Sequence, residues 1–133
     1  MIKKIEHIGI AVKDLKKSEE LFEKLLGEKP YKTEEVKSEG VTTSFFKVAD
    51  QNVELLYPAN EDSPISKFIK KRKEGIHHLA LHVDNIKNEV ERLEGLGFEF
   101  ISTTPKKGAD NKMIVFLHPK TTNGVLVELC EEI

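Results

Sequence analysis

Hydrophobic residues recur along the chain with two different periods. In some segments the period is that of a strand, and in others it is that of a helix. Strands are indicated where β-branched, aromatic and other apolar residues run together between charged or turn-forming residues. The segments with this pattern are residues 5–12, 29–37, 41–49, 52–58, 76–83, 98–102, 113–119 and 124–130. The segment 29–37 is the weakest of them.

Helices are indicated at three places, each starting at a residue that caps helices and ending at or near a glycine. The second helix has a serine cap followed by proline at its first position, which is a strong helix start. Its run of lysines is most simply a solvated helix face. The cap and the terminal glycine of each helix are, in chain order, Asp14 and Gly27, Ser63 and Gly75, and Asn85 and Gly97.

The predicted elements occur twice in the same order, so the chain is an internal repeat of a β-α-β-β-β module. The first module covers residues 1–58 and the second covers residues 76–133, with residues 59–75 as a helical linker. We therefore predict a single domain over residues 1–133 of the α+β class. In this fold the two modules form a curved, partly closed sheet around a shared cleft.

Composition narrows the class of protein. The 133 residues are 38% hydrophobic and 33% charged, which is typical of a globular protein, and the formal net charge of −2 does not favour nucleic acid as a partner. The single cysteine, Cys130, fits a reducing compartment. We find no signal-peptide pattern and no apolar run of about 18 residues. We therefore expect a cytoplasmic protein that does not bind membranes.

Each copy of the repeat carries one histidine and one glutamate at matching positions. His7 opens HIGIAVKDL and His78 opens HLALHVDNI, while Glu54 lies in NVELL and Glu128 in LVELC. Alternation along the strands places small residues on the face of each histidine, which leaves room for a ligand. Both glutamates lie in apolar strands, where an unpaired carboxylate is costly to bury.

Two imidazoles and two carboxylates at matched positions suit a divalent metal such as Co, Mn, Ni, Zn or Fe. We therefore predict a metal site built from His7, Glu54, His78 and Glu128. Each residue alone has a simpler explanation, because a histidine at a strand start is often structural and a buried glutamate often pairs with lysine. The repetition of the pair favours the metal.

The remaining histidines and the cysteine are weaker candidates for a functional role. His77 should point to the face opposite His78 and pack or be solvated there, whereas His82 shares the face of His78 and is a candidate for lining a pocket. His118 precedes a proline in a turn, which favours a structural role first and ligand contact second. Cys130 has no neighbouring base, so nucleophilic catalysis is a poor fit.

The last loops are rich in lysine, with Lys106, Lys107, Lys112 and Lys120. These lysines could receive a phosphorylated ligand, although scattered surface lysines are the simpler interpretation. The chain has neither a P-loop nor a GxGxxG motif. We therefore expect no nucleotide cofactor bound by those routes.

Together these segments resemble the vicinal oxygen chelate superfamily of glyoxalases, bleomycin resistance proteins and dioxygenases, and within it the methylmalonyl-CoA epimerases. The resemblance covers nearly the whole chain and rests on IEHIGIAVKDL, NVELLYP, DSPISKFIKK, GIHHLALHVDNI and FLHPKTTNGVLVEL. The first and fourth segments occur throughout the superfamily. DSPI with its basic helix, and the ending from HPK to GVLVEL, are more particular to the epimerases.

The resemblance implies a glyoxalase-like fold and one divalent metal ion, cobalt first, with Mn, Ni and Zn as alternatives. Its ligands would be His7, His78 and Glu128, with Glu54 where relatives carry Gln or Glu. It also implies an isomerase acting on methylmalonyl-CoA, which removes the C2 proton through an enolate and returns a proton on the opposite face. Relatives are commonly dimers, so we expect a homodimer.

Epimerisation uses two proton-transfer groups, and the resemblance makes Glu128 the first. Some relatives place a second glutamate after the Gly-Val of the third strand, where this chain has Thr43. Threonine cannot serve as a base. We therefore expect Glu54, a water molecule or another side chain to take this role.

Three other functions fit parts of the pattern. A glyoxalase I-type lyase uses similar ligands and enolate chemistry, but we find no glutathione-recognising segment. An extradiol dioxygenase uses two histidines and one glutamate with iron, which would leave Glu54 redundant. A non-catalytic small-molecule-binding member of the fold commonly loses the ligand set, which this chain retains.

Overall fold

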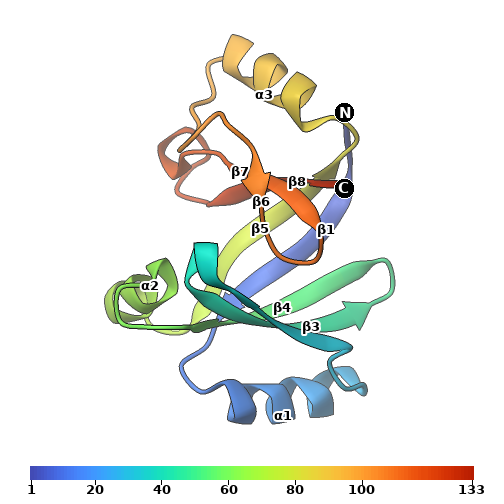
Figure 1. Ribbon diagram of the computed structural model, residues 1–133, viewed down its shortest axis with the longest axis vertical. Helices are drawn as coiled ribbons and strands as arrows, with labels where there is room; N and C mark the ends of the chain where they lie inside the picture. Colours follow the sequence, from blue (N-terminus) through green and yellow to red (C-terminus); the bar gives the residue numbers. More distant parts are fainter. The chain divides into compact units, whose positions relative to one another are not determined.

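The computed structural model describes residues 1–133, and its helices and strands follow one another in a repeated order (Figure 1). Residue contacts divide the chain into two compact units. The N-terminal unit is the continuous segment His7–His77, and the C-terminal unit combines Met1–Glu6 with His78–Ile133. The first strand, β1 (Ile2–Ala11), therefore gives its first half to one unit and its second half to the other.

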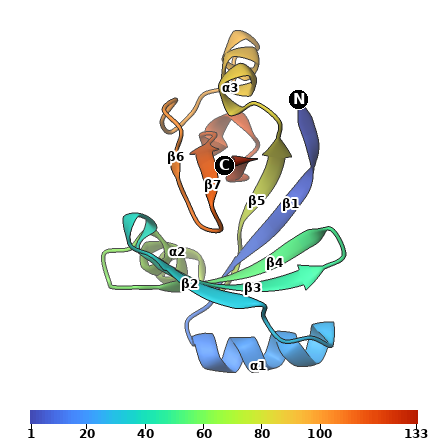
Figure 2. The same cartoon turned by 45° about the vertical axis from the view of Figure 1, so that its right-hand side comes forward.

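The N-terminal unit contains the second half of β1 and the elements that follow it. They are α1 (Leu15–Leu26), β2 (Lys32–Val36), η1 (Lys37–Glu39), β3 (Val41–Val48), β4 (Gln51–Pro58) and α2 (Pro64–Arg72). β1 pairs in parallel with β4. The antiparallel pairs β4–β3 and β3–β2 continue this sheet, as Figure 2 shows.

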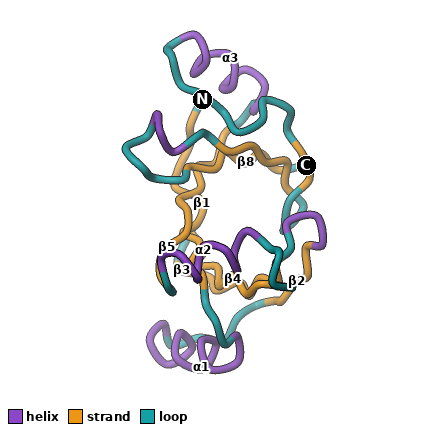
Figure 3. The backbone as a smooth tube through the Cα atoms, turned by 90° about the vertical axis from the view of Figure 1, so that its left-hand side faces the viewer, coloured by secondary structure: helices purple, strands orange, loops and turns teal.

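The C-terminal unit repeats this connectivity. Its elements are β5 (Gly75–Val83), whose first residues belong to the other unit, then α3 (Ile86–Gly95), β6 (Lys106–Lys107), β7 (Lys112–Phe116), η2 (Pro119–Thr121) and β8 (Val127–Glu132). β5 pairs in parallel with β8, and β8–β7 and β7–β6 are antiparallel. Figure 3 draws the strands of both units in orange and the helices in purple. The parallel pair β5–β8 corresponds to β1–β4, so the predicted α+β class is confirmed.

Side-chain caps start the helices where the sequence predicts them. The Asp14 carboxylate accepts a 3.0 Å hydrogen bond from the backbone N–H of Lys17. The Asn85 side chain accepts a bond of the same length from the backbone N–H of Asn88, and Ser63 caps α2 in the same way. Each cap satisfies one of the N–H groups that the first turn of a helix leaves unpaired.

The ends of the helices agree less closely with the positions predicted from the glycines. Gly27 follows α1 directly and has the left-handed φ of 80° that glycine adopts without strain. α3 ends at Gly95, before the predicted Gly97. α2 ends at Arg72, ahead of Gly75. None of these helices has the length and apolar composition needed to cross a membrane.

Each unit has its own apolar core between a helix and a sheet. In the N-terminal unit, Phe22 and Leu26 of α1 pack against the buried Phe46 and Leu55 of β3 and β4. Figure 1 shows α1 lying along the strands β3 and β4. The buried core residues beneath α3 in the C-terminal unit are Val83, Ile86, Val90, Leu93, Val115, Leu117 and Leu129. Because side chains alternate along a strand, the opposite faces of the same sheets are free to carry polar groups.

One predicted strand is wrong and one short strand was not predicted. Residues 98–102 form no strand, and only Phe100 makes an isolated bridge, to Leu117. The partner edge of β7 is taken instead by β6, which lies within the segment expected to be a polar loop. Asp110 and Asn111, with φ of 55° and 54°, make the tight turn between these strands. Asp and Asn tolerate this backbone conformation better than most residues.

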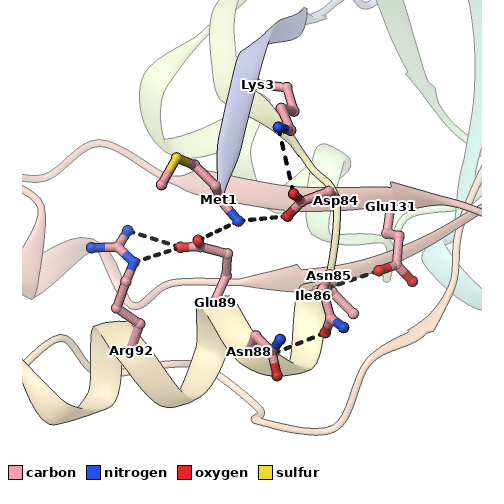
Figure 4. Close-up of polar contacts among 9 residues, drawn as sticks. All are labelled: Met1, Lys3, Asp84, Asn85, Ile86, Asn88, Glu89, Arg92 and Glu131. Atoms are coloured by element: carbon pink, nitrogen blue, oxygen red, sulfur yellow. Dashed lines mark hydrogen bonds and ion pairs between the residues drawn. The ribbon is translucent and has the colours of Figure 1, made fainter.

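An ion-pair network joins the start of β1 to α3 within the C-terminal unit (Figure 4). The Met1 ammonium lies 2.5 Å from Asp84 Oδ1 and 2.7 Å from Glu89 Oε1. Arg92 donates hydrogen bonds to Glu89, with its Nη2 at 2.8 Å from the carboxylate. At the first turn of α3, the Glu131 carboxylate accepts a 3.0 Å bond from the backbone N–H of Ile86. The first turns of α3 are therefore held by Met1, which precedes β1, and by Glu131 of β8.

Candidate metal and catalytic site

The first predicted pair lies on the parallel strands β1 and β4 of the N-terminal unit. His7 Nδ1 is 3.1 Å from Glu54 Oε2, and each residue is only 5% exposed. In the register of these strands Glu54 lies opposite Gly9, two positions beyond His7. Glycine leaves space beside the imidazole, so the glutamate side chain can turn toward it.

The second predicted pair lies on the parallel strands β5 and β8 of the C-terminal unit. His78 Nε2 is 3.4 Å from Glu128 Oε1, and each residue is only 6% exposed. Glu128 lies opposite Ala80, again two positions beyond the histidine. The two units thus build the same buried His–Glu pair with the same register and with a small residue at the same place.

The chemistry of these donors fits a divalent metal. Each pair offers an imidazole nitrogen and a carboxylate oxygen from a buried position, and these are ligand types common to Zn, Co, Mn and Ni sites. A buried carboxylate is costly unless a cation, a hydrogen-bond donor or a metal compensates its charge. The structure brings the four predicted residues into two pairs, and their role as ligands stays a prediction.

Phe116 is a neighbour of the second pair that the sequence analysis did not single out. Its ring lies edge-on to the His78 imidazole, with centroids 5.9 Å apart and an interplanar angle of 86°. Phe116 of β7 also lies opposite Glu128 in the strand register. The alternation of β7 was a signal that could have identified it, because Ile114 and Phe116 share the face that meets Glu128.

His77 and His118 lie in structural settings, whereas a pocket-lining role of His82 stays a prediction. The His77 ring packs edge-on against Phe68 with centroids 4.9 Å apart, and burial lowers the pKa of His77 to about 4. His118 is exposed, and its Nδ1 accepts a 3.1 Å hydrogen bond from the backbone N–H of Lys120. His82 is partly buried on β5, opposite Cys130 of β8.

Thr43 is buried on the face of the sheet that also carries Glu54 of β4. It is 1% exposed and lies opposite Leu56 in the register of β3 and β4. Leu56 shares the face of Glu54, so Thr43 also belongs to that face. Its neighbour Ser44 donates a 2.7 Å hydrogen bond to Glu19 of α1 from the other face. Threonine offers no carboxylate, and Glu54 is the carboxylate of β4 on the same face.

The four lysines of the last loops were expected to be scattered over the surface, and three of them are exposed. Lys106 and Lys107 are exposed, and Lys120 is exposed and lies 3.0 Å from Glu99. Lys112 is buried, with only 8% of its surface exposed. The expectation of scattered surface lysines is therefore wrong for Lys112, because the β6–β7 hairpin turns its side chain into the unit.

Comparison with known proteins identifies the family of this chain. A model of the Glyoxalase/Bleomycin resistance protein/Dioxygenase superfamily matches residues 6–116. The chain belongs to this superfamily. Within the superfamily, the mitochondrial methylmalonyl-CoA epimerase of Dictyostelium discoideum is 42% identical, and the match covers 98% of this chain and 80% of that protein.

Solved structures of superfamily members are similar over the same length. The methylmalonyl-CoA epimerase of Mycobacterium tuberculosis has a TM-score of 0.95 and 33% identity, covering 99% of this chain and 89% of that chain. A methylmalonyl-CoA epimerase in complex with methylmalonyl-CoA and NH4+ has a TM-score of 0.94 and 31% identity, covering 99% and 96%. The glyoxalase-like fold that the resemblance implied is thereby confirmed.

Proposed function

We propose that this superfamily member is a divalent-metal-dependent isomerase that interconverts (R)- and (S)-methylmalonyl-CoA. The observation that carries the proposal is the buried His–Glu pair found at the same place in both repeats. It occurs in a chain that is similar over nearly its whole length to methylmalonyl-CoA epimerases. The solved complex of one such relative with methylmalonyl-CoA supports the same substrate.

The proposed metal ligands are His7, Glu54, His78 and Glu128. Their support is the donor set itself, two imidazoles and two buried carboxylates, together with the superfamily to which the chain belongs. A bound divalent ion would act as a Lewis acid and stabilise negative charge developing on the thioester oxygen. Cobalt is our first expectation, and Mn, Ni and Zn are the alternatives.

The proposed proton-transfer groups are Glu128 and Glu54. Glu128 takes the C2 proton as a carboxylate, and a second group returns a proton to the opposite face. Because Thr43 offers no carboxylate, Glu54 is our candidate for the second role. The two glutamates are also proposed ligands, so their titrations are coupled and belong to the site as a whole.

The function is tested by proton NMR of methylmalonyl-CoA with the purified protein in D₂O. Metal-loaded protein should remove the C2 proton signal much faster than a protein-free control, because deprotonation exchanges that proton for deuterium. Chelation should abolish the exchange, and added cobalt should restore it. A folded, metal-loaded protein that gives no exchange would contradict the epimerase and favour a lyase or a binding role.

We further propose a cytoplasmic homodimer. The resemblance to the epimerases supports the dimer, and the buried thiol of Cys130, which forms no disulfide, agrees with a reducing compartment. Light scattering over a range of concentrations tests the assembly. A mass that stays at 15.1 kDa throughout would contradict the dimer.

A further inference from the structure

Lys112 of β7 is a buried cation inside the C-terminal unit. Only 9% of its side chain is exposed, whereas Lys106 and Lys107 of the neighbouring β6 are exposed. A lysine is seldom buried this far, because removing an ammonium group from water is costly unless a partner compensates it. The partners of Lys112 therefore decide what its ammonium can do.

The carboxylates near this ammonium are held at long distances. Lys112 Nζ is 3.5 Å from Asp110 Oδ2 and 3.9 Å from Glu6 Oε2. A charge-assisted hydrogen bond is usually about 2.7–2.9 Å long, and an ammonium group has three N–H donors. Burial lowers the pKa of Lys112, but Glu6 and Asp110 outweigh it and raise that pKa above its ordinary value. The group is thus a cation with capacity for a closer acceptor.

The Lys112 ammonium lies on the face of the sheet that carries Glu128. In the strand order β8 and β5 lie between β7 and β1, so the approach of Lys112 to Glu6 crosses these two strands. Ile114 lies opposite Cys130 in the register of β7 and β8, and Lys112 is two positions from Ile114, so Lys112 and Cys130 share one face. Cys130 and Glu128 are two positions apart on β8 and therefore share one face.

We propose that Lys112 binds the free carboxylate of a malonyl-type CoA thioester, which replaces the Asp110 carboxylate on its ammonium. This inference rests on the proposed function and adds the residue that recognises the acid group of the substrate. Asp110 suits the exchange because it lies on a tight turn, is partly exposed, and contacts Lys112 only at 3.5 Å. Exchanging one carboxylate for another leaves the charge of the buried group unchanged.

The exchange also helps the chemistry. Removal of the C2 proton builds negative charge beside the free carboxylate of the substrate, and two negative charges so close together repel each other. An ammonium group already fixed at the carboxylate reduces this repulsion without further reorganisation. Lys112 therefore has a role both in selecting malonyl thioesters and in easing proton removal from them.

The test compares the binding of malonyl-CoA and acetyl-CoA, which differ in the free carboxylate, by calorimetry on the metal-loaded full chain. The wild type should prefer malonyl-CoA. In Lys112→Met the affinity for malonyl-CoA should fall by about 10- to 100-fold, the range for a lost charged hydrogen bond, with acetyl-CoA unchanged. Asp110→Asn should bind malonyl-CoA more tightly because the competing charge is gone. The exposed control Lys107→Met should match the wild type.

Two results would overturn the inference. A folded Lys112→Met variant that keeps the full preference for malonyl-CoA would exclude Lys112 as the carboxylate-binding residue. If that variant does not fold, Asp110→Asn decides, and unchanged or weaker malonyl-CoA binding would exclude the exchange. Wild-type protein that epimerises methylmalonyl-CoA in either case leaves the proposed function standing. Wild-type protein that binds neither thioester removes the proposed function together with this inference.

Discussion

Glu128 has the surroundings that a proton-transfer residue needs. Its carboxylate is buried beside the His78 imidazole, and Phe116 lies opposite it on the neighbouring strand. A carboxylate shielded from water by an aromatic ring and an imidazole interacts more strongly with charge than an exposed one does. Glu132, on the same strand, is exposed and offers a matched comparison.

Replacing Glu128 by Gln should lower the rate of epimerisation by at least about 100-fold, because an amide cannot accept the C2 proton. The rate is measured by the same deuterium exchange with cobalt in excess, so that weaker metal binding does not limit it. Glu132→Gln should leave the rate unchanged. Near-normal exchange in Glu128→Gln would remove this residue from the proton transfer.

The sequence could predict the His–Glu pairs but not Lys112. His7 and His78 open similar segments, and Glu54 and Glu128 follow at matching places. These matching positions in the two modules allowed the four residues to be predicted. Lys112 lies in the polar segment PKKGADNK, which has the composition of a solvated loop. Its burial depends on a turn at Asp110 and Asn111 and on contacts far along the chain, which local composition does not encode.

At the scale of elements, α3 depends on a buried carboxylate near its start. Glu89 is 3% exposed, and both Arg92 and the Met1 ammonium contact it (Figure 4). The hydrogen bonds from Arg92 lower the pKa of Glu89, although burial acts in the opposite direction. The ionised form is therefore favoured by folding, and its contribution to stability is present above the unfolded value of 4.5.

Replacing Glu89 by Gln should lower the free energy of unfolding at pH 7 by about 1 kcal/mol, since Arg92 is half exposed and part of its charge is solvated. The wild type should lose this advantage as the pH falls through the lowered pKa of Glu89, so the two proteins converge in acid. Urea unfolding at several pH values measures the difference. Glu91→Gln on the exposed side of α3 is the control, and equal losses in both variants would refute the role of Glu89.

Local rules predicted the starts of helices better than the edges of sheets. Asp14 and Asn85 cap α1 and α3 because a cap acts only on the turn that follows it. The alternating residues 98–102 look like a strand, yet only Phe100 makes a bridge. Whether such a segment pairs depends on which edge is open, and β6 already occupies the edge of β7.

For the whole molecule, the proposed metal should couple ligand binding to stability. A metal that binds only the folded chain stabilises it by about 2.7 kcal/mol when its concentration is a hundred times its dissociation constant. Cobalt should therefore raise the midpoint of thermal unfolding of chelator-treated protein. His7→Ala and His78→Ala should each lose that increase, because each removes one ligand, whereas His118→Ala should keep it. An equal cobalt response in all three variants would contradict the ligand assignment.

The division of β1 has a consequence for biosynthesis. The segment His7–His77 is continuous, so every residue of the N-terminal unit has been made before the second half of the chain emerges from the ribosome. Met1–Glu6 belongs to the other unit, and its partners are made afterwards; the backbone N–H of Asp84, for example, donates a hydrogen bond to the carbonyl of Met1. Contacts so distant in sequence form slowly because a long loop must close first. The segment Met1–Glu6 therefore pairs with its native partners only after residues 78–133 have been made, and its strand edge is open to other chains until then.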